Sequence, residues 1–336
     1  MNMRIQTLRG LACVLLVMYH VVGADASFGL RVEDGPVRWL NDGLAYLRMP
    51  LFTFLSGLVY GLRPFAGNSR AFLVGKARRL LIPMLVVGTL FALLQGLTPG
   101  THSSVASWYL LHVLPVAHFW FVESLFWVFL VIWALERWRL IAHAKGFLLT
   151  LALSCALYLS IRGWPWLSLE GAIYLMPYFL VGLGASRFPI AAQLAKPWVR
   201  GGLLVLAIVA AASMGMPTPN PDRRTLPMLL LGVSLCLLCL SSGMVVSWLA
   251  RVGRYSYAIY LFHVFFTAFI RLLLDRMEID SMMLDLLLGV AFGLAGPVLI
   301  ERVFAGLRWP ALLLLGRTVK AGNPAGARRD HLLAAR

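Results

Sequence analysis

The chain is dominated by apolar runs that are separated by short polar segments. Most of the runs reach roughly 17–25 residues, the length that an α-helix needs to cross a hydrocarbon core about 30 Å thick. Because they are apolar on every side and carry few charges, they predict transmembrane helices rather than half-exposed helices of a soluble bundle. We predict ten spans, of which the fifth and seventh are the shortest, at residues 7–24, 44–62, 80–97, 117–135, 146–161, 170–186, 201–215, 226–243, 256–274 and 283–304.

Charged residues in the polar segments predict the orientation of these spans. If the N-terminus lies inside and every charge is assigned to its nearer side, the inner side carries 22 of the 30 Lys and Arg residues, including Arg9 and Arg302, but only three of the 14 acids. An excess of Lys and Arg marks the cytoplasmic side of a membrane protein, so both termini are predicted to be cytoplasmic. We expect one all-α membrane domain over residues 1–305. Residues 306–336 are predicted to form a basic cytoplasmic tail that is disordered towards its end.

Composition supports a multi-pass membrane protein, with 60% hydrophobic and 13% charged residues among 336 and a mean hydropathy of +0.81. The formal net charge of +16 is explained by topology and by contact with the anionic lipid of the bilayer. A nucleic-acid partner would require a soluble basic surface, so none is expected. The cysteines all lie in apolar runs and are interpreted as small buried hydrophobes, and no metal site is expected. They are Cys13, Cys155, Cys236 and Cys239.

The first apolar run, "RGLACVLLVMYH", contains an arginine and a histidine, both of which are costly inside a membrane. Arg9 and His20 are eleven residues apart, which in an α-helix corresponds to three turns plus about 20° and to about 16.5 Å along the axis. Both side chains therefore share one helix face, with Arg9 near the cytoplasm and His20 deeper in the membrane. Two interpretations stay open from this spacing alone. In the first interpretation, both residues take part in catalysis or ligand binding. In the second, Arg9 extends to lipid phosphate and His20 forms a hydrogen bond with a neighbouring helix.

Other apolar runs also contain unusual polar residues. "RMPLFTFLSGLVYGL" contains Ser56 beside Gly57, a combination that favours close helix packing. "KARRLLIP" places Lys76, Arg78 and Arg79 at the predicted inner surface. "HFWFVESLFW" holds Trp120 and Glu123, and "GRYSYAIYLFHVFF" contains a second intramembrane histidine, His263. Taken singly, each stretch is equally compatible with structural roles in helix packing or in interfacial aromatic belts.

Taken in order, these stretches resemble the acyltransferase-3 family of integral-membrane O-acyltransferases, with the pattern most similar to the fucose 4-O-acetylase-like branch. The resemblance extends from about residue 4 to 305 and includes the ten spans. Its most specific element is Arg-x10-His, matched by Arg9 and His20; "MPLFTFLSG", "FWF" and "YSYAIYLFH" match the next landmarks. The family's Arg-x-x-Arg is only partly kept, because Lys76 stands at the first arginine and cannot reproduce a bidentate guanidinium fork.

The resemblance implies an acyltransferase of the cytoplasmic (inner) membrane. It would move an acyl group, most often acetyl, from cytoplasmic acyl-CoA to a hydroxyl of a cell-surface or exported glycan or glycolipid. Acetyl-CoA is then a donor substrate, and Arg9 with Lys76, Arg78 and Arg79 would bind its phosphates. His20 would act at the acyl group, either as a general base or as an acylated intermediate.

Several questions stay open at this point. Glu123 either orients an imidazole or substrate, or is a hydrogen-bonded packing acid, and His263 has either a functional or a structural role. Ser56 has no base assigned to it and is interpreted as a helix-packing residue. The alternative function is a transporter that uses intramembrane Arg, His and Glu as a proton or substrate relay. A third possibility is a membrane scaffold without catalytic activity, in which these polar groups form hydrogen bonds with one another. The acceptor, the acyl group and the oligomeric state are left open.

Overall fold

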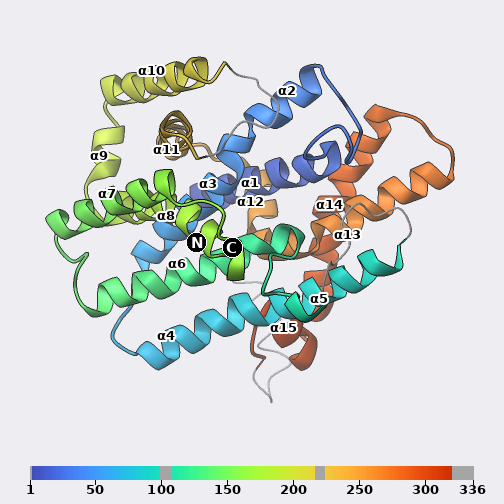
Figure 1. Ribbon diagram of the computed structural model, residues 1–336, viewed down its shortest axis with the longest axis horizontal. Helices are drawn as coiled ribbons and strands as arrows, with labels where there is room; N and C mark the ends of the chain where they lie inside the picture. Colours follow the sequence, from blue (N-terminus) through green and yellow to red (C-terminus); the bar gives the residue numbers. More distant parts are fainter. Residues whose placement is uncertain (1, 99–107, 216–223, 320–336) are drawn as a thin grey trace.

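The computed structural model describes residues 2–98, 108–215 and 224–319, and Figure 1 shows the helices that they form. In those ranges the only β-type pairing is an isolated bridge between Leu111 and Leu114. The α-helices are α1 (Met3–Val22), α2 (Pro36–Gly43), α3 (Ala45–Leu62), α4 (Ser69–Lys76), α5 (Ile82–Leu97), α6 (Trp120–Arg137), α7 (Ala144–Ser160), α8 (Leu169–Arg187), α9 (Ile190–Leu194), α10 (Pro197–Ser213), α11 (Leu226–Ser241), α12 (Ser247–Arg254), α13 (Ser256–Arg276), α14 (Met282–Phe304) and α15 (Arg308–Leu315).

Six helical segments in the described ranges are long and apolar enough to cross a membrane. Three more apolar helices, α7, α10 and α11, have 16 or 17 residues, and α3 has 18 residues. Each of the ten predicted ranges therefore overlaps a helix, and the all-helical, multi-pass membrane class is confirmed. The count of ten spans and the cytoplasmic placement of both termini stay predictions. The six segments are Met3–Val22, Ser69–Leu97, Ala117–Arg137, Trp166–Arg187, Ser256–Arg276 and Met282–Phe304.

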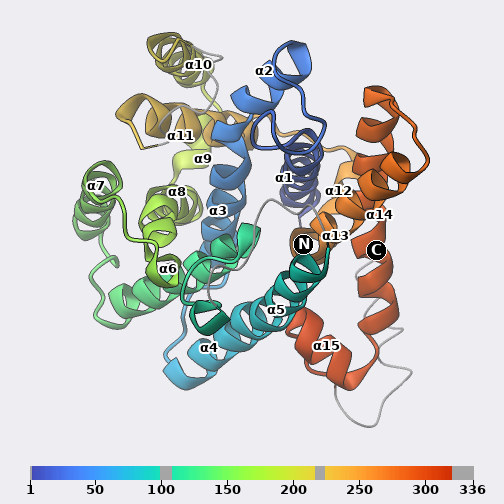
Figure 2. The same cartoon turned by 45° about the vertical axis from the view of Figure 1, so that its right-hand side comes forward.

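Helix α1 lies inside the bundle. It packs against α3 on one side and against α12, α13 and α14 on the other, as Figure 2 shows, whereas α7 and α10 lie at the edge. Because helices surround it, the polar side chains of α1 face protein neighbours more than lipid. This position is the one in which an intramembrane Arg and His are expected to have partners.

Helices α3 and α8 cross at a reciprocal pair of glycines. A Cβ atom at Gly57 would lie 2.0 Å from the carbonyl oxygen of Phe179, and one at Gly182 would lie 1.9 Å from that of Phe54. Only glycine allows the two backbones to approach this closely. The prediction that the Ser56–Gly57 pair permits close packing is thus confirmed for Gly57. The Ser56 hydroxyl donates to the Phe52 carbonyl of its own helix at 2.8 Å.

Small residues on α14 form a second close contact. Added Cβ atoms would lie 2.9 Å from the Val21 side chain at Gly289 and 2.6 Å from that of Val17 at Gly293. The stretch "GVAFGLAG" at residues 289–296, with small residues at i, i+4 spacing, therefore packs against the half of α1 that carries His20. It fixes how closely α14 approaches that half.

The beginning of the predicted tail is a helix in the structure. α15 lies beside α5 and ends at Gly316, whose φ of 63° is left-handed. A Cβ there would lie 2.6 Å from the carbonyl oxygen of Arg78. The segment after the last predicted span thus returns to the basic stretch at the start of α5. The prediction of disorder falls mostly on residues 320–336, which lie outside the described residues.

Candidate active site

Three histidines from three helical segments meet at the end of α1. The ring centroids are 4.7 Å apart for His20 and His263, 5.6 Å for His20 and His118, and 5.0 Å for His118 and His263. His20 comes from the last turn of α1, His263 from α13, and His118 from a short 3-10 turn, Ala117–Phe119, that leads into α6. We call these three side chains the histidine cluster.

His118 is the member that sequence reasoning did not select. The sequence places it at the start of the predicted span 117–135, close to His112 and to His102, which lies outside the described residues. His112 bonds the Thr89 hydroxyl at 2.9 Å, and burial lowers the pKa of this imidazole. His118 instead is buried among aromatic rings, and its carbonyl oxygen accepts a hydrogen bond from the Tyr260 hydroxyl. The sequence feature that could have identified His118 is its position directly before the "FWF" landmark.

The ring of His263 is oriented by its own helix. Its Nδ1 lies 2.8 Å from the Ile259 carbonyl oxygen and 3.0 Å from that of Tyr260. Because carbonyl oxygens only accept, Nδ1 carries the proton in the neutral ring and Nε2 carries the lone pair. That Nε2 is buried and has no hydrogen-bond partner within the described ranges. His263 therefore offers an acceptor within the cluster, beside His20.

Both ring nitrogens of His118 are also buried, and neither makes a hydrogen bond in the part of the chain that the structure describes. An unpaired buried polar group costs about 1–3 kcal/mol. A packing role alone would be served better by phenylalanine. The unpaired nitrogens are available to a bound molecule.

A polar network fixes the end of α1. The Arg48 guanidinium lies 4.5 Å from the centroid of Tyr19, the residue before His20, and donates to Asn41 Oδ1 at 2.6 Å. Asn41 Nδ2 in turn donates to the Gly23 carbonyl oxygen at 3.2 Å. Arg38, paired with Asp42 at 2.8 Å, donates to the same carbonyl. Helix α2 and the start of α3 thereby hold the C-terminal end of α1, a role that sequence reasoning did not assign to Arg48.

The basic residues expected to bind the donor are arranged by a π-helical turn, Ala77–Leu81. Such turns widen a helix and are frequent at functional sites. Arg79 lies close enough to Arg9 for the two like charges to interact, and its carbonyl oxygen accepts a hydrogen bond from the Tyr257 hydroxyl. The Lys76 ammonium also interacts electrostatically with Arg79, and its Nζ lies 3.3 Å from the Phe129 ring centroid. Arg79 thus lies near both Arg9 and Lys76, and Lys76 makes an aromatic contact as well.

The Glu123 carboxylate forms a hydrogen bond with the turn that precedes α8. Its Oε2 accepts from the Ser168 hydroxyl at 2.6 Å, and the neighbouring Ser124 hydroxyl donates to the Ser168 carbonyl at 2.8 Å. Leu167 and Ser168 have φ values of 53° and 51°, which are unfavourable for side-chain-bearing residues. These hydrogen bonds stabilise that strained turn, so the contacts of Glu123 fit the packing interpretation rather than that of an imidazole partner.

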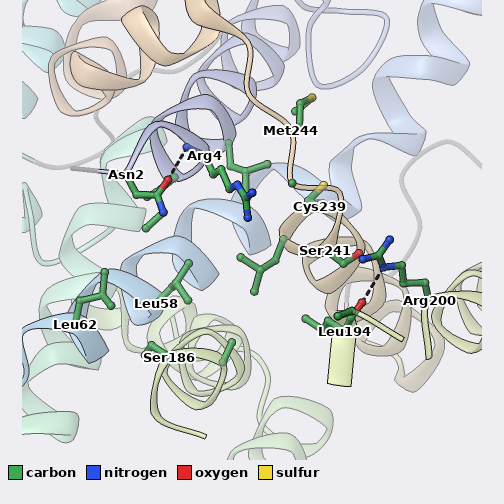
Figure 3. Close-up of a pocket in the computed structure, with 16 residues that line it drawn as sticks. Asn2, Arg4, Leu58, Leu62, Ser186, Leu194, Arg200, Cys239, Ser241 and Met244 are labelled. Atoms are coloured by element: carbon green, nitrogen blue, oxygen red, sulfur yellow. Dashed lines mark hydrogen bonds between the residues drawn. The ribbon is translucent and has the colours of Figure 1, made fainter. Parts of the chain in front are cut away.

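Two cavities flank this arrangement, and neither is lined by Arg9 or His20. The larger, of about 490 Å³, has walls from the ends of α1, α3, α8 and α11, with Arg4 and Arg200 at its margins. Figure 3 shows Arg4 hydrogen-bonded to Asn2, and Arg200 to the Leu194 carbonyl. The smaller, of about 360 Å³, lies beside Trp120 and Arg224. In the described ranges no three His, Cys, Asp or Glu side chains are placed to ligate a metal ion.

Arg9 is partly buried among apolar helices, and the histidine cluster lies at the other end of the same helix. A family model described as an acyltransferase domain matches residues 3–302. The chain therefore belongs to the acyltransferase-3 family, and it is an acyltransferase that transfers groups other than amino-acyl groups. No curated protein and no solved structure matches it. The resemblance is thus confirmed for the family, whereas the fucose 4-O-acetylase-like branch stays a prediction.

Proposed function

We propose that this protein is an O-acyltransferase of the cytoplasmic membrane that uses acyl-CoA, most often acetyl-CoA, to acylate a hydroxyl of a surface or exported glycan or glycolipid. The observation that carries the proposal is the cluster of three imidazoles at the far end of the helix face that begins at Arg9. Arg9 and Arg79 bind the phosphates of the donor through charge-assisted hydrogen bonds. The thin pantetheine arm extends along α1 towards His20.

In the general-base form of the mechanism, His20 takes the proton of the acceptor hydroxyl while that oxygen attacks the thioester carbonyl carbon. The new C–O bond forms, the C–S bond breaks, and the leaving thiolate of CoA receives the proton from His20. In the covalent form, a ring nitrogen of His20 attacks the thioester carbonyl carbon, the C–S bond breaks, and CoA leaves as its thiol with the proton of the other ring nitrogen. The acceptor hydroxyl then attacks the acyl-imidazole, the C–N bond breaks, and the hydroxyl proton returns to His20. In the general-base form, and before acylation in the covalent form, His263 Nε2 accepts a hydrogen bond from the His20 N–H and so orients its ring.

His118 supplies a further polar contact. Its ring is 5.6 Å from that of His20, between centroids, and both of its nitrogens are buried without a partner in the described part of the chain. A ring N–H directed at the thioester carbonyl would stabilise the negative charge that develops there. We assign His118 to this position because its ring lies beside that of His20 within the histidine cluster.

The proposal is tested with purified protein in lipid nanodiscs, radiolabelled acetyl-CoA and surface polysaccharide extracted from the host. His20→Ala and His20→Gln are expected to lower kcat by about 100-fold or more, while the yield and the elution volume of the protein stay normal. The matched control is His143→Ala, because that histidine lies between α6 and α7 and takes no part in the cluster. Full transfer by His20→Ala would refute the assignment.

A further inference from the structure

The smaller cavity has the composition of a sugar-binding site. It is formed by residues from α3, α6, α8 and the segments that precede α6, α8 and α11, and its volume is about 360 Å³. Small-molecule sites usually span about 300–1,000 Å³ and combine apolar walls with a few fixed polar groups. This one is at the small end of that range, so it suits one terminal sugar residue better than a long stretch of polymer. Its lining residues are Met49, Pro115, Trp120, Pro165, Ser168, Glu170, Gly171, Tyr174 and Arg224.

Two aromatic side chains form its apolar wall. The Trp120 and Tyr174 rings are 6.3 Å apart between centroids and lie edge to face at 63°. Gly171 makes room for the indole, because a Cβ atom there would lie 2.7 Å from Trp120 Cε3. Both rings are only partly buried. A flat aromatic face that stays partly open in a cavity offers an apolar platform for the C–H face of a pyranose ring.

A fixed guanidinium provides the polar wall. Arg224 is 8% exposed and donates to the carbonyl oxygens of Ile161 and Glu170, each at 2.6 Å. The Glu170 carboxylate lies 3.3 Å from the same guanidinium. Burial lowers the pKa of Arg224, and the Glu170 carboxylate opposes that change. A guanidinium and a carboxylate at fixed positions are a donor and an acceptor for sugar hydroxyls at low entropic cost.

The cavity adjoins the histidine cluster through two helices. On α3, Arg48 lies against Tyr19 beside His20, and the next residue, Met49, lines the cavity. At the start of α6, His118 belongs to the cluster, and Trp120, two residues later, lines the cavity. The same two segments therefore border both the cavity and the histidine cluster, with side chains one or two positions apart directed to different faces. The basic stretch before α5 lies at the other end of α1, since Arg79 interacts with Arg9.

We propose that this cavity is the acceptor site of the enzyme and that it binds a single sugar residue between Trp120, Tyr174 and Arg224. The inference rests on the proposed O-acyltransferase function and adds to it the place and the chemistry of acceptor recognition. The sugar presents one hydroxyl to the histidine cluster. Trp120 contacts its apolar face, and Arg224 with Glu170 binds the remaining hydroxyls.

The first test separates acceptor binding from donor use in nanodiscs, with host polysaccharide as acceptor and acetyl-CoA as donor. Trp120→Ala is expected to raise KM for the polysaccharide about tenfold or more, with a smaller effect for Trp120→Phe. KM for acetyl-CoA, and the slow release of CoA without acceptor, should stay within about twofold of the wild type. The matched control is Trp39→Ala, since this indole is 49% exposed on α2 and lines neither cavity. An unchanged acceptor KM in Trp120→Ala, or an equal rise in both KM values, would overturn the inference.

The second test does not depend on acyl transfer. A photoreactive phenylalanine analogue replaces Trp120 or Trp39 in host cells, and after irradiation the purified protein is stained for carbohydrate. We expect a carbohydrate adduct at position 120 and none at position 39. An adduct at 120 in a protein that releases no CoA would refute the proposed function and support the sugar site. Absence of any adduct at 120, with transfer intact, would refute the site alone.

Discussion

The imidazole rings of His20 and His263 lie 4.7 Å apart, edge to face at 63°, although they come from opposite ends of the chain. Hydrogen bonds to the Ile259 and Tyr260 carbonyls fix the ring of His263. The lone pair of Nε2 is therefore on the side of the ring away from its own helix. A base whose ring is oriented by a neighbouring acceptor is the arrangement that acyl transfer repeatedly uses. We therefore propose His263 as a positioning residue for His20.

Substitutions of His263 separate orientation from packing. The Asn side chain reproduces the Nδ1–H donor to the helix carbonyls but offers nothing at Nε2, whereas the Gln side chain reaches the Nε2 position with its amide oxygen. We expect His263→Asn to lower kcat by about tenfold or more, with KM for acetyl-CoA unchanged and an altered pH profile of kcat. His263→Gln should retain more activity. Equal kcat and pH profiles for both variants would indicate a purely structural residue.

His118→Phe tests the two unpaired nitrogens of that ring. Phenylalanine keeps the aromatic packing against Phe119 and Tyr260 and removes the buried polar atoms. Because those atoms have no partner within the described ranges, Tm of the purified protein should be equal or higher. The turnover number should fall by about 100-fold if the ring N–H stabilises the developing oxyanion. Unchanged turnover would show that the nitrogens contact no reacting group.

The donor site is tested by arginines at two different places on the predicted inner side. Arg9→Ala and Arg79→Ala should each raise KM for acetyl-CoA about tenfold, which is about 1.4 kcal/mol of binding free energy. The affinity of the wild-type protein for acetyl-CoA should weaken as salt is added, because salt screens the attraction between arginine and phosphate charges. Arg4→Ala and Arg200→Ala, at the margins of the cavity in Figure 3, are the matched controls. If these two raise KM and the first two do not, the donor binds in that cavity instead.

The reciprocal glycines of α3 and α8 are expected to determine stability rather than chemistry. Gly57→Ala and Gly182→Ala would place a methyl group about 2 Å from a backbone carbonyl oxygen, and overpacking of this kind costs about 1–3 kcal/mol. Both variants should lower Tm in differential scanning fluorimetry. Gly201→Ala on α10 serves as the control, since nothing lies within 4 Å of an added Cβ. Tm should stay equal or rise slightly there, because alanine favours the helix. A Tm unchanged in both α3 and α8 variants would contradict the close approach.

The helical membrane class and the family of this protein could be predicted from its amino-acid sequence. Length and hydropathy of an apolar run are local properties, and the helical period places Arg9 and His20 on one face of α1 wherever that helix packs. The i, i+4 spacing of small residues in "GVAFGLAG" is likewise a local pattern that favours a helix contact face. Sequence landmarks also led to the family, and so to the class of reaction.

Tertiary packing decided the rest. By sequence, His118 is one of three histidines between residues 102 and 118, and only the approach of α6 and α13 to the end of α1 brings its ring to His20. Similarly, Lys76, Arg78 and Arg79 look equivalent in sequence, but in the fold Arg79 lies near both Arg9 and Lys76, while Lys76 also contacts Phe129. Contacts between segments far apart in the chain depend on how helix faces fit one another, and no local period records that fit.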